Sequence, residues 1–216
     1  LTHFQGKRVS VPVPLTHTLS RDEALQRYIE EDEALPIQNA AWNKLYKKEL
    51  IAPFRYPEHK LYEDMVVTTK VIAASDKVAF VDTPLYHYII DRGGSIMNRG
   101  VNPRIISDQI PAYREKSAFL QSIGKHHLAD THDYLVLKKL LVLYTETFRQ
   151  ADGKQLRRAL KEEMATYQNG AERIYNCSIA DPHQTLRMKL FFLHPALYNA
   201  FTAINNGVLH RIRGIA

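Results

Sequence analysis

The sequence predicts an α+β protein that is predominantly helical and has few, short strands. Three observations lead to this class. The part after residue 100 consists of long segments in which apolar residues recur at helical spacing. Residues 60–72 form a helix pattern that is apolar nearly all round. Strand patterns are short, the clearest at residues 78–81, and the 216 residues suffice for one or two domains with a sizeable core.

The chain begins with a stretch that is rich in Val, Pro and Thr. Pro12 and Pro14 stand at alternate positions, and proline cannot donate a hydrogen bond within a sheet. Residues 1–19 are therefore predicted as an extended connector or an edge strand. Ser20 and Glu23 then have the spacing of a capping box, which predicts a helix to about residue 31. Its apolar side would hold Ala24, Leu25, Tyr28 and Ile29.

Residues 40–51 fit either a short helix or a strand followed by a turn. In a helix, one face would carry Trp42, Leu45, Tyr46 and Leu50. Two interpretations of Trp42 remain open at this stage. It is either an anchor of the core or an aromatic wall of a ligand pocket.

The central helix pattern covers residues 60–72 and carries two acidic residues on its first turn. A helix that is apolar nearly all round is a buried helix, so Glu63 and Asp64 would lie where a buried helix begins. The positive end of the helix dipole stabilises a carboxylate anion there, which suits Asp64 to accept a proton. The alternative is that both residues only decorate the first turn.

After this helix, residues 75–77 predict a turn, residues 78–81 a short strand and residues 85–90 a second strand. Residues 91–95 form a loop by composition. This loop is either a solvated hairpin connection or a flap that closes on an anion. Arg92 would suit a diphosphate, because its planar guanidinium donates hydrogen bonds in pairs.

From residue 103 onward the pattern is helical. The predicted helices span residues 103–123, 130–150 and 154–169, and Gly170 is a helix stop. The core stripe of the second helix comprises Leu135, Leu137, Leu140, Leu141, Tyr144 and Phe148. His126, His127 and His132 are interpreted as loop histidines, because no Cys or acidic ligand set is spaced to complete a metal site. Residues 182–216 contain no acidic residue and predict either a packed terminal helix or a basic amphipathic segment on an anionic membrane.

Composition narrows the functional classes. The single cysteine, Cys177, excludes an internal disulfide and fits a reducing compartment. No apolar run approaches the length of a membrane span. The net charge of +6 favours anionic partners. Nucleic acid is disfavoured among them, because basic and aromatic residues are not interleaved in a recognisable motif.

Several motifs follow one another in a characteristic order: residues 41–50, 54–58, 62–64, 81–88 and 92–96. This order resembles the second half of the catalytic domain of bacterial family 2 glycosyltransferases, which are inverting enzymes with a GT-A fold. The resemblance covers roughly residues 40–97. It implies that residues 1–100 are the acceptor-side part of a GT-A domain and that residues 101–216 are a helical C-terminal extension.

The resemblance also implies roles for individual residues. Asp64 would be the general base, and Glu63 would bind the acceptor or orient its neighbour. Trp42 and Lys44 would line the acceptor side, with Trp42 as a wall of the sugar pocket whose aromatic face stacks on sugar CH groups. The leaving diphosphate would be held by Arg92 and Ser95, with help from His87.

A divalent metal, Mg²⁺ or Mn²⁺, is expected from the resemblance. Its ligands would lie mostly outside this chain, because the sequence has no Asp-x-Asp motif and only Glu31-Asp32-Glu33 comes near it. A Gly-rich phosphate loop is also missing, since Gly93-Gly94 stands alone. We therefore interpret the chain as the acceptor-side half of an enzyme whose donor-binding half is not included.

The expected partners are a nucleotide-sugar donor and a surface-glycan or lipid-linked acceptor, with homodimerisation left open. The expected location is cytoplasmic, including peripheral contact with the inner face of the cell membrane. An alternative from another class is a non-catalytic helical interaction or dimerisation module. In that case Asp64 would be capped or paired, whereas a catalytic Asp64 would open onto a concave surface with Trp42 and Arg92.

Overall fold

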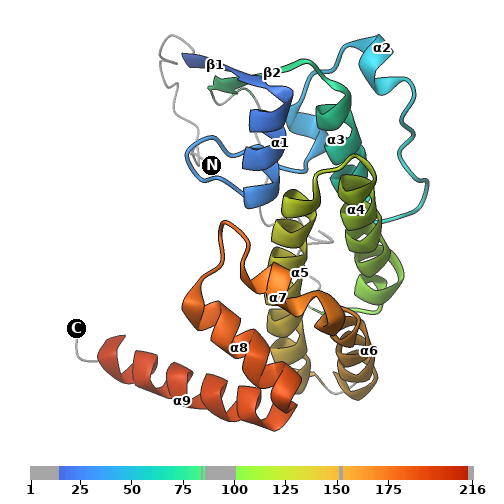
Figure 1. Ribbon diagram of the computed structural model, residues 1–216. Helices are drawn as coiled ribbons and strands as arrows, with labels where there is room; N and C mark the ends of the chain where they lie inside the picture. Colours follow the sequence, from blue (N-terminus) through green and yellow to red (C-terminus); the bar gives the residue numbers. More distant parts are fainter. Residues whose placement is uncertain (1–14, 84, 86–100, 151–152, 214–216) are drawn as a thin grey trace, which may run out of the picture. The chain divides into compact units, whose positions relative to one another are not determined.

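The computed structural model describes residues 15–83, 85, 101–150 and 153–213; for residue 15 and residues 206–213 it describes the backbone alone. The chain divides into two compact units, residues 1–100 and residues 101–216 (Figure 1). Helices dominate, and the described residues form two short strands. The predicted class, α+β and predominantly helical, is confirmed. The assignment of the units to a catalytic half and an extension stays a prediction.

The first unit contains a two-stranded antiparallel ribbon. Strand β1 (Leu15–Ser20) pairs with β2 (Lys77–Asp82), so that Leu15 lies opposite Asp82 and Ser20 lies opposite Lys77. Strand β2 confirms the predicted strand at residues 78–81. The proline-containing stretch at residues 9–14 lies outside the described residues.

Helix α1 (Arg21–Glu30) begins where the sequence predicts. The Ser20 hydroxyl accepts a hydrogen bond from the Glu23 backbone N–H (3.3 Å), and the Glu23 carboxylate accepts one from the Ser20 backbone N–H (2.8 Å). This reciprocal pairing is the capping box. The predicted apolar side is buried in full: Ala24, Leu25, Tyr28 and Ile29.

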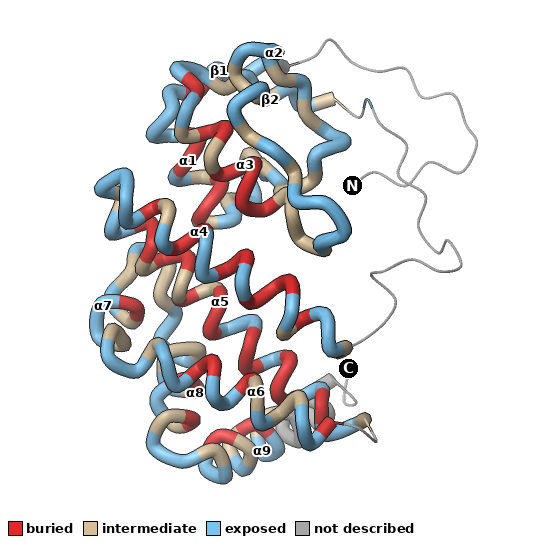
Figure 2. Tube along the Cα trace, turned by 90° about the vertical axis from the view of Figure 1, so that its right-hand side faces the viewer, coloured by how far each residue is buried: buried red, intermediate tan, exposed pale blue. Residues whose placement is uncertain are grey.

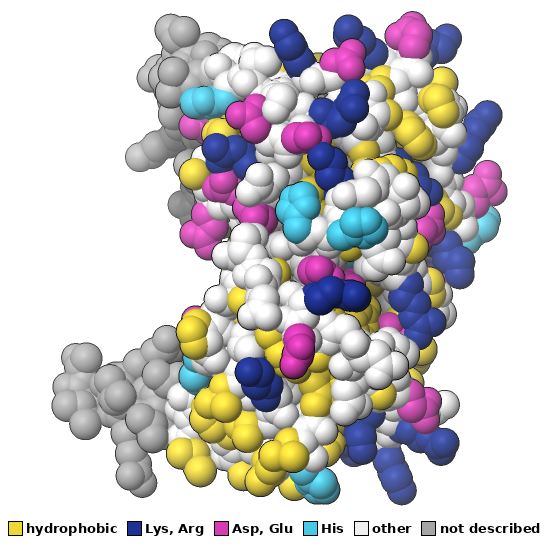
Figure 3. All heavy atoms as spheres, viewed as in Figure 1, with side chains coloured by type: hydrophobic (Ala, Val, Ile, Leu, Met, Phe, Trp, Pro, Cys, Tyr) yellow, Lys and Arg dark blue, Asp and Glu magenta, His cyan; other side chains and the backbone are white. Residues whose placement is uncertain are grey.

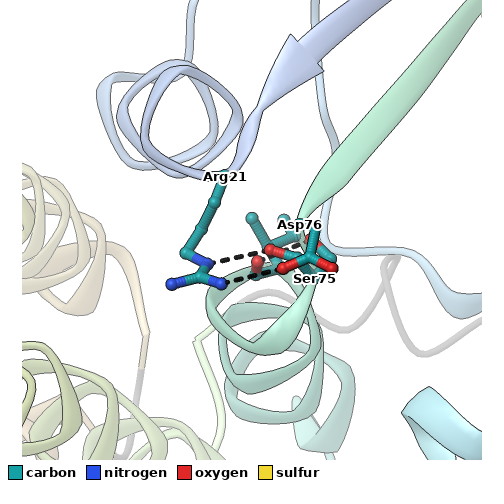
Figure 4. A network of polar contacts seen from close by, with 4 residues as sticks. Arg21, Ser75 and Asp76 are labelled. Carbon is teal, nitrogen blue, oxygen red and sulfur yellow. Dashed lines mark hydrogen bonds and ion pairs between the residues drawn. The ribbon is translucent and has the colours of Figure 1, made fainter.

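Arg21 ties the start of α1 to the turn between helix α3 (Glu63–Ala74) and β2. Its Nε donates to the Ser75 carbonyl oxygen at 2.9 Å, and its Nη2 lies 3.2 Å from Asp76 Oδ1 (Figure 4). The Arg21 backbone N–H also donates to the Asp76 carbonyl oxygen at 3.3 Å. The ends of both helices are therefore held at one end of the ribbon.

Helix α3 is the buried helix that the sequence predicts, although it begins at Glu63. Its buried side chains surround most of the helix: Met65, Val66, Val67, Thr68, Thr69, Val71 and Ile72. The buried hydroxyls are satisfied, since Thr68 donates to the Asn39 carbonyl (2.9 Å) and Thr69 to the Met65 carbonyl (2.7 Å). Buried segments of α1 and α3 are seen together in Figure 2.

The common face that one helix over residues 40–51 would have is not formed. The segment forms a 3₁₀ turn, η1 (Ala41–Asn43), and a short helix, α2 (Lys48–Ile51), separated by a non-helical stretch. Lys44 has extended backbone angles (φ −131°, ψ 146°), which interrupt the helical period. Leu45 consequently points to solvent with 102% exposure, and Trp42 is 41% exposed, which excludes a core anchor.

The second unit is helical throughout its described residues. A π-helical turn, η3, leads into α4, and α5 continues into the 3₁₀ turn η4; a second 3₁₀ turn, η5, precedes α7. Helix α5 is central, because α4, α6, α7 and α8 all pack against it. The elements are η3 (Ile105–Gln109), α4 (Ile110–Ser122), α5 (His126–Glu146), η4 (Thr147–Arg149), α6 (Gly153–Ala165), η5 (Gln168–Gly170), α7 (Ala171–Tyr175), α8 (Pro182–Leu193) and α9 (Pro195–Arg213).

The core stripe of α5 largely agrees with the sequence. Leu137, Leu140, Leu141 and Tyr144 are buried. Leu135 is only partly buried, and Phe148 is 53% exposed because it falls in η4, beyond the end of α5.

The interpretation of the three histidines as loop residues is wrong. His126 and His127 begin α5, and His132 is buried within it. The Nε2 atom of His132 lies 3.1 Å from the Tyr113 carbonyl oxygen. Burial, together with the charge of Lys116, lowers the pKa of His132 well below its ordinary value. The histidine is therefore held neutral inside the helical core.

Helices α8 and α9 form a packed hairpin. Phe191 is buried, with its ring centroid 5.1 Å from that of Tyr144 and 5.6 Å from that of Tyr198. Phe192 and Phe201 are only partly buried. The packed-helix interpretation of the tail thus holds for the inner face of α8.

Asp133, next to His132, gives the stability of the protein a predictable pH dependence. Burial raises the pKa of its carboxyl to about 7, against the opposing effects of Ser117 and Arg173. The folded protein therefore binds a proton that the unfolded chain releases near pH 3.8, so stability should fall as pH rises from about 4 to about 7. At ~1.4 kcal/mol per pKa unit, discounted for partial solvent contact, the fall is roughly 2 kcal/mol.

The difference between the protein and its Asp133→Asn variant isolates this effect, because His132 titrates in both. The free energy of unfolding, measured by urea titration across that pH range, should depend less on pH in the variant. Equal slopes in the two proteins would show that Asp133 ionises normally in the folded state.

Candidate active site

Glu63 and Asp64 lie on the first turn of α3, which follows an unusual backbone conformation. Tyr62, the residue before the helix, has φ 66°, and His59 has φ 59°. Residues other than glycine in this left-handed region cost on the order of 1–3 kcal/mol each and are found preferentially at functional sites. No side chain caps the helix at Tyr62. The backbone therefore presents Glu63 and Asp64 from a strained and uncapped helix start.

Neither carboxylate has a direct partner among the residues that the structure describes. Among the described residues, Glu63 and Asp64 make no hydrogen bond and no ion pair, and both are partly exposed. A structural acidic residue at a helix start would be paired or would cap the backbone. Asp64 therefore has the free carboxylate that a proton acceptor needs.

Lys44 lies within electrostatic range of Asp64. Burial lowers the pKa of Lys44 to about 8, and the charge of Asp64 opposes this shift. Its Nζ donates to the Ala40 carbonyl (2.8 Å), to Asn43 Oδ1 (2.7 Å) and to the Gln38 carbonyl. An ammonium group has three donors, so in this arrangement Lys44 holds the residue 38–43 segment together. A contact between Lys44 and substrate stays a prediction.

Two tyrosines without a predicted role, Tyr46 and Tyr56, lie near each other, and Tyr46 is within electrostatic range of Asp64. Their hydroxyl oxygens are enclosed, and neither has a partner in hydrogen-bonding geometry among the described residues. Burial raises the pKa of Tyr46 to about 12; Tyr56 and the charge of Asp64 raise the pKa further, and the nearby Thr68 hydroxyl opposes the shift. Tyr56 belongs to the motif at residues 54–58, which could have pointed to it. The spacing of that motif alone gives Tyr56 no role.

Trp42, in η1, presents an exposed ring on the same segment as Lys44. Because this exposure excludes a core anchor, stacking on a sugar is the interpretation of Trp42 that remains to be tested. The other predicted site residues, His87, Arg92 and Ser95, lie outside the described residues. The structure thus brings Asp64, Lys44 and Tyr46 together. The residues predicted to bind the diphosphate are not among those it describes.

Two negative findings apply to the described part of the chain. No group of three or more His, Cys, Asp or Glu side chains there is arranged to hold a metal ion. The divalent metal therefore stays an expectation from the resemblance. No helix in the described ranges is long and apolar enough to cross a bilayer.

Comparison with curated proteins gives two relatives. "Putative glycosyltransferase EpsH" of Bacillus subtilis (strain 168) is 26% identical over 148 residues, which are 65% of this chain and 42% of that protein. "Glycosyltransferase GlyA" of Streptococcus pneumoniae serotype 4 is 32% identical over 93 residues, which are 42% of this chain and 13% of that protein. The chain is similar to glycosyltransferases. No family model matches it, and no solved structure does.

The chain therefore spans less than half the length of either relative. The names of the relatives support glycosyl transfer at a general level. The donor, the acceptor, the stereochemistry and the catalytic base are proposals that rest on the site.

Proposed function

We propose that the chain forms the acceptor-side part of an inverting family 2 glycosyltransferase of the GT-A type, with Asp64 as the general base. The observation that carries this proposal is the Asp64 carboxylate at the start of a buried helix, which makes no hydrogen bond or ion pair within the described ranges. The similarity to proteins named glycosyltransferases supports the reaction class. We also propose a cytoplasmic location, because nucleotide-sugars are made there.

In this mechanism the transfer is a single displacement. Asp64 removes the proton from the acceptor hydroxyl as its oxygen attacks the anomeric carbon. The bond from that carbon to the diphosphate oxygen breaks, and the nucleoside diphosphate leaves from the opposite face, which inverts the anomeric configuration. Glu63 binds or orients the acceptor, and the exposed Trp42 ring stacks on a sugar. Arg92 balances the charge of the diphosphate, and the Ser95 hydroxyl donates a hydrogen bond to it.

The direct test uses the full protein that contains this chain. It is incubated with a panel of UDP-, GDP- and TDP-sugars and with glycan or lipid-linked acceptors. We expect acceptor-dependent release of a nucleoside diphosphate and, by NMR of the product, an inverted anomeric carbon. A retained configuration would contradict the single displacement, and no turnover with any donor would contradict the proposed function.

The two enclosed tyrosines give a prediction about the acceptor. Tyr46 lies near both Asp64 and Tyr56, both tyrosines are half-buried, and in the described part of the chain their hydroxyls have no hydrogen-bond partner. A sugar hydroxyl that displaces the side chains enclosing them would complete these hydrogen bonds. Tyr46→Phe and Tyr56→Phe should each raise the acceptor KM by about 2- to 10-fold, the equivalent of one hydrogen bond. The donor KM should be unchanged.

Steady-state kinetics with one substrate varied at a time separates the two constants. Tyr28→Phe is the matched control, because the Tyr28 hydroxyl already donates to the Met65 carbonyl oxygen at 3.0 Å. If both site variants raise the donor KM instead, the tyrosines belong to the donor side.

A further inference from the structure

The second unit carries a basic stripe along one face of α6. Its members are spaced i, i+3, i+4 and i+7, which places them on one side of a helix. They are Lys154, Arg157, Arg158 and Lys161. All four line an open cavity of about 630 Å³, whose lining includes a single acidic residue, Glu162.

The charges of the basic stripe are only partly compensated. Arg158 Nε pairs with Glu162 at 2.9 Å, and both side chains are mostly exposed. Arg157 donates to the Thr147 carbonyl at 2.8 Å and lies 4.4 Å from the centre of the Phe148 ring. In the described part of the chain, Lys154 and Lys161 make no hydrogen bond and no ion pair. The cavity therefore keeps an excess of positive charge that points to an anionic ligand.

Exposed apolar side chains occur in this cavity and next to its lining residues in the sequence. Phe148 lines it, as do Pro195, Ala196 and Asn199 of α9; Leu193 and Leu197 do not line it but come immediately before and after the 194–196 turn. Leu193 is 74% exposed and Leu197 is 44% exposed. We call Phe148, Leu193 and Leu197 the apolar rim. Figure 3 shows apolar side chains gathered over the α8–α9 hairpin, and Lys and Arg side chains at the end of this unit that holds α6.

The hairpin adds no negative charge to this surface. Residues 182–213 contain neither Asp nor Glu, and Arg187 and Lys189 lie on α8. An anionic surface approaching the apolar rim would therefore meet no repulsion from α8 or α9. A soluble anion would account for the basic stripe but not for the exposed leucines, and a purely apolar partner would leave the lysines without a counter-charge.

We propose that the basic stripe and the apolar rim together form a docking surface for an anionic lipid bilayer. Lipid phosphates enter the cavity and pair with Lys154 and Lys161, while Leu193 and Leu197 insert among the acyl chains at the interface. This places the membrane site on α6 and the hairpin turn, whereas composition alone indicated residues 182–216. The inference stands independently of the proposed sugar transfer.

The test is co-sedimentation of the chain with vesicles of phosphatidylcholine alone or mixed with phosphatidylglycerol. We expect binding to the mixed vesicles only, and weaker binding as salt is added, because surface charges are screened within roughly 8 Å at physiological ionic strength. Lys154→Gln combined with Lys161→Gln should weaken the partition coefficient about 25-fold, since each basic residue contributes about a factor of five. Leu193→Ser should also weaken it, without changing its salt dependence.

Lys138→Gln combined with Lys139→Gln is the matched control. It removes the same charge from exposed positions of α5 that do not line the cavity, and it should leave binding nearly unchanged. Equal losses of vesicle binding in the two double variants would show that only net charge matters, and would overturn the proposal. Displacement from vesicles by inorganic phosphate would identify a soluble anion site instead. Tighter binding to a short RNA than to the mixed vesicles would also contradict it.

Discussion

Replacing Asp64 by asparagine is expected to lower the turnover of sugar transfer by about 10²- to 10⁴-fold in the protein that contains this chain. Asparagine keeps the size of the side chain but cannot accept the proton of the acceptor hydroxyl. The carboxylate makes no hydrogen bond or ion pair with another described residue, so the change should leave the fold intact. The measurement is kcat at saturating donor and acceptor, with the donor dissociation constant determined by calorimetry.

Glu63→Gln and Glu49→Gln complete this experiment. Glu63 is the neighbouring carboxylate, and its loss should act on the acceptor KM more than on kcat. Glu49 lies in α2, is exposed and should be neutral. If Asp64→Asn retains near-normal turnover while Glu63→Gln abolishes it, the base is Glu63. If both retain turnover, neither carboxylate of α3 is catalytic and the site lies elsewhere.

Features determined by neighbouring residues could be predicted from the sequence. The capping box of Ser20 and Glu23 involves four consecutive positions, and α1 begins there. The apolar pattern of residues 60–72 indicated a buried helix, and the helical period correctly placed Glu63 and Asp64 on its first turn. Strand β2 followed from a β-branched run.

Features that depend on particular side-chain contacts could not be predicted. Residues 40–51 have a helical apolar spacing, yet the ammonium group of Lys44 binds the carbonyls of Gln38 and Ala40, six and four residues earlier, and holds a different local conformation. His132 falls within the predicted helix of residues 130–150, yet nothing in its neighbourhood indicates that the Tyr113 carbonyl of another helix faces its ring. Only for His132 is the deciding partner distant in the sequence.

The residues of the candidate site also differ in whether the sequence could predict them. Asp64 could be selected because its helix position and the order of the surrounding motifs both point to it. The enclosed hydroxyls of Tyr46 and Tyr56 could be recognised only in the folded structure, which brings Tyr46 near both Tyr56 and Asp64. A tyrosine in a sequence gives no indication of whether its hydroxyl will find a partner, and that property makes these two candidates for acceptor binding.

The largest expected effect on stability is at Tyr198, which joins the α8–α9 hairpin to α5. The side chain is 0% exposed, and its hydroxyl donates to the Leu141 carbonyl at 3.1 Å and lies 2.9 Å from Thr145 Oγ1. The Arg187 guanidinium donates to the same hydroxyl at 3.2 Å. Tyr198 therefore combines a fully buried ring with three polar contacts, and two of them are to α5.

Tyr198→Ala should lower the free energy of unfolding by about 3–5 kcal/mol, because a buried aromatic ring is replaced by a cavity. Tyr198→Phe keeps the ring and loses only the hydroxyl, so it should cost about 1 kcal/mol. Leu197→Ala is the control, since Leu197 is the preceding residue and is 44% exposed. It should change stability by about 0.5 kcal/mol or less, as surface substitutions usually do. Urea titration followed by circular dichroism gives all three values, and a similar loss in Tyr198→Ala and Leu197→Ala would show that the hairpin is not anchored through Tyr198.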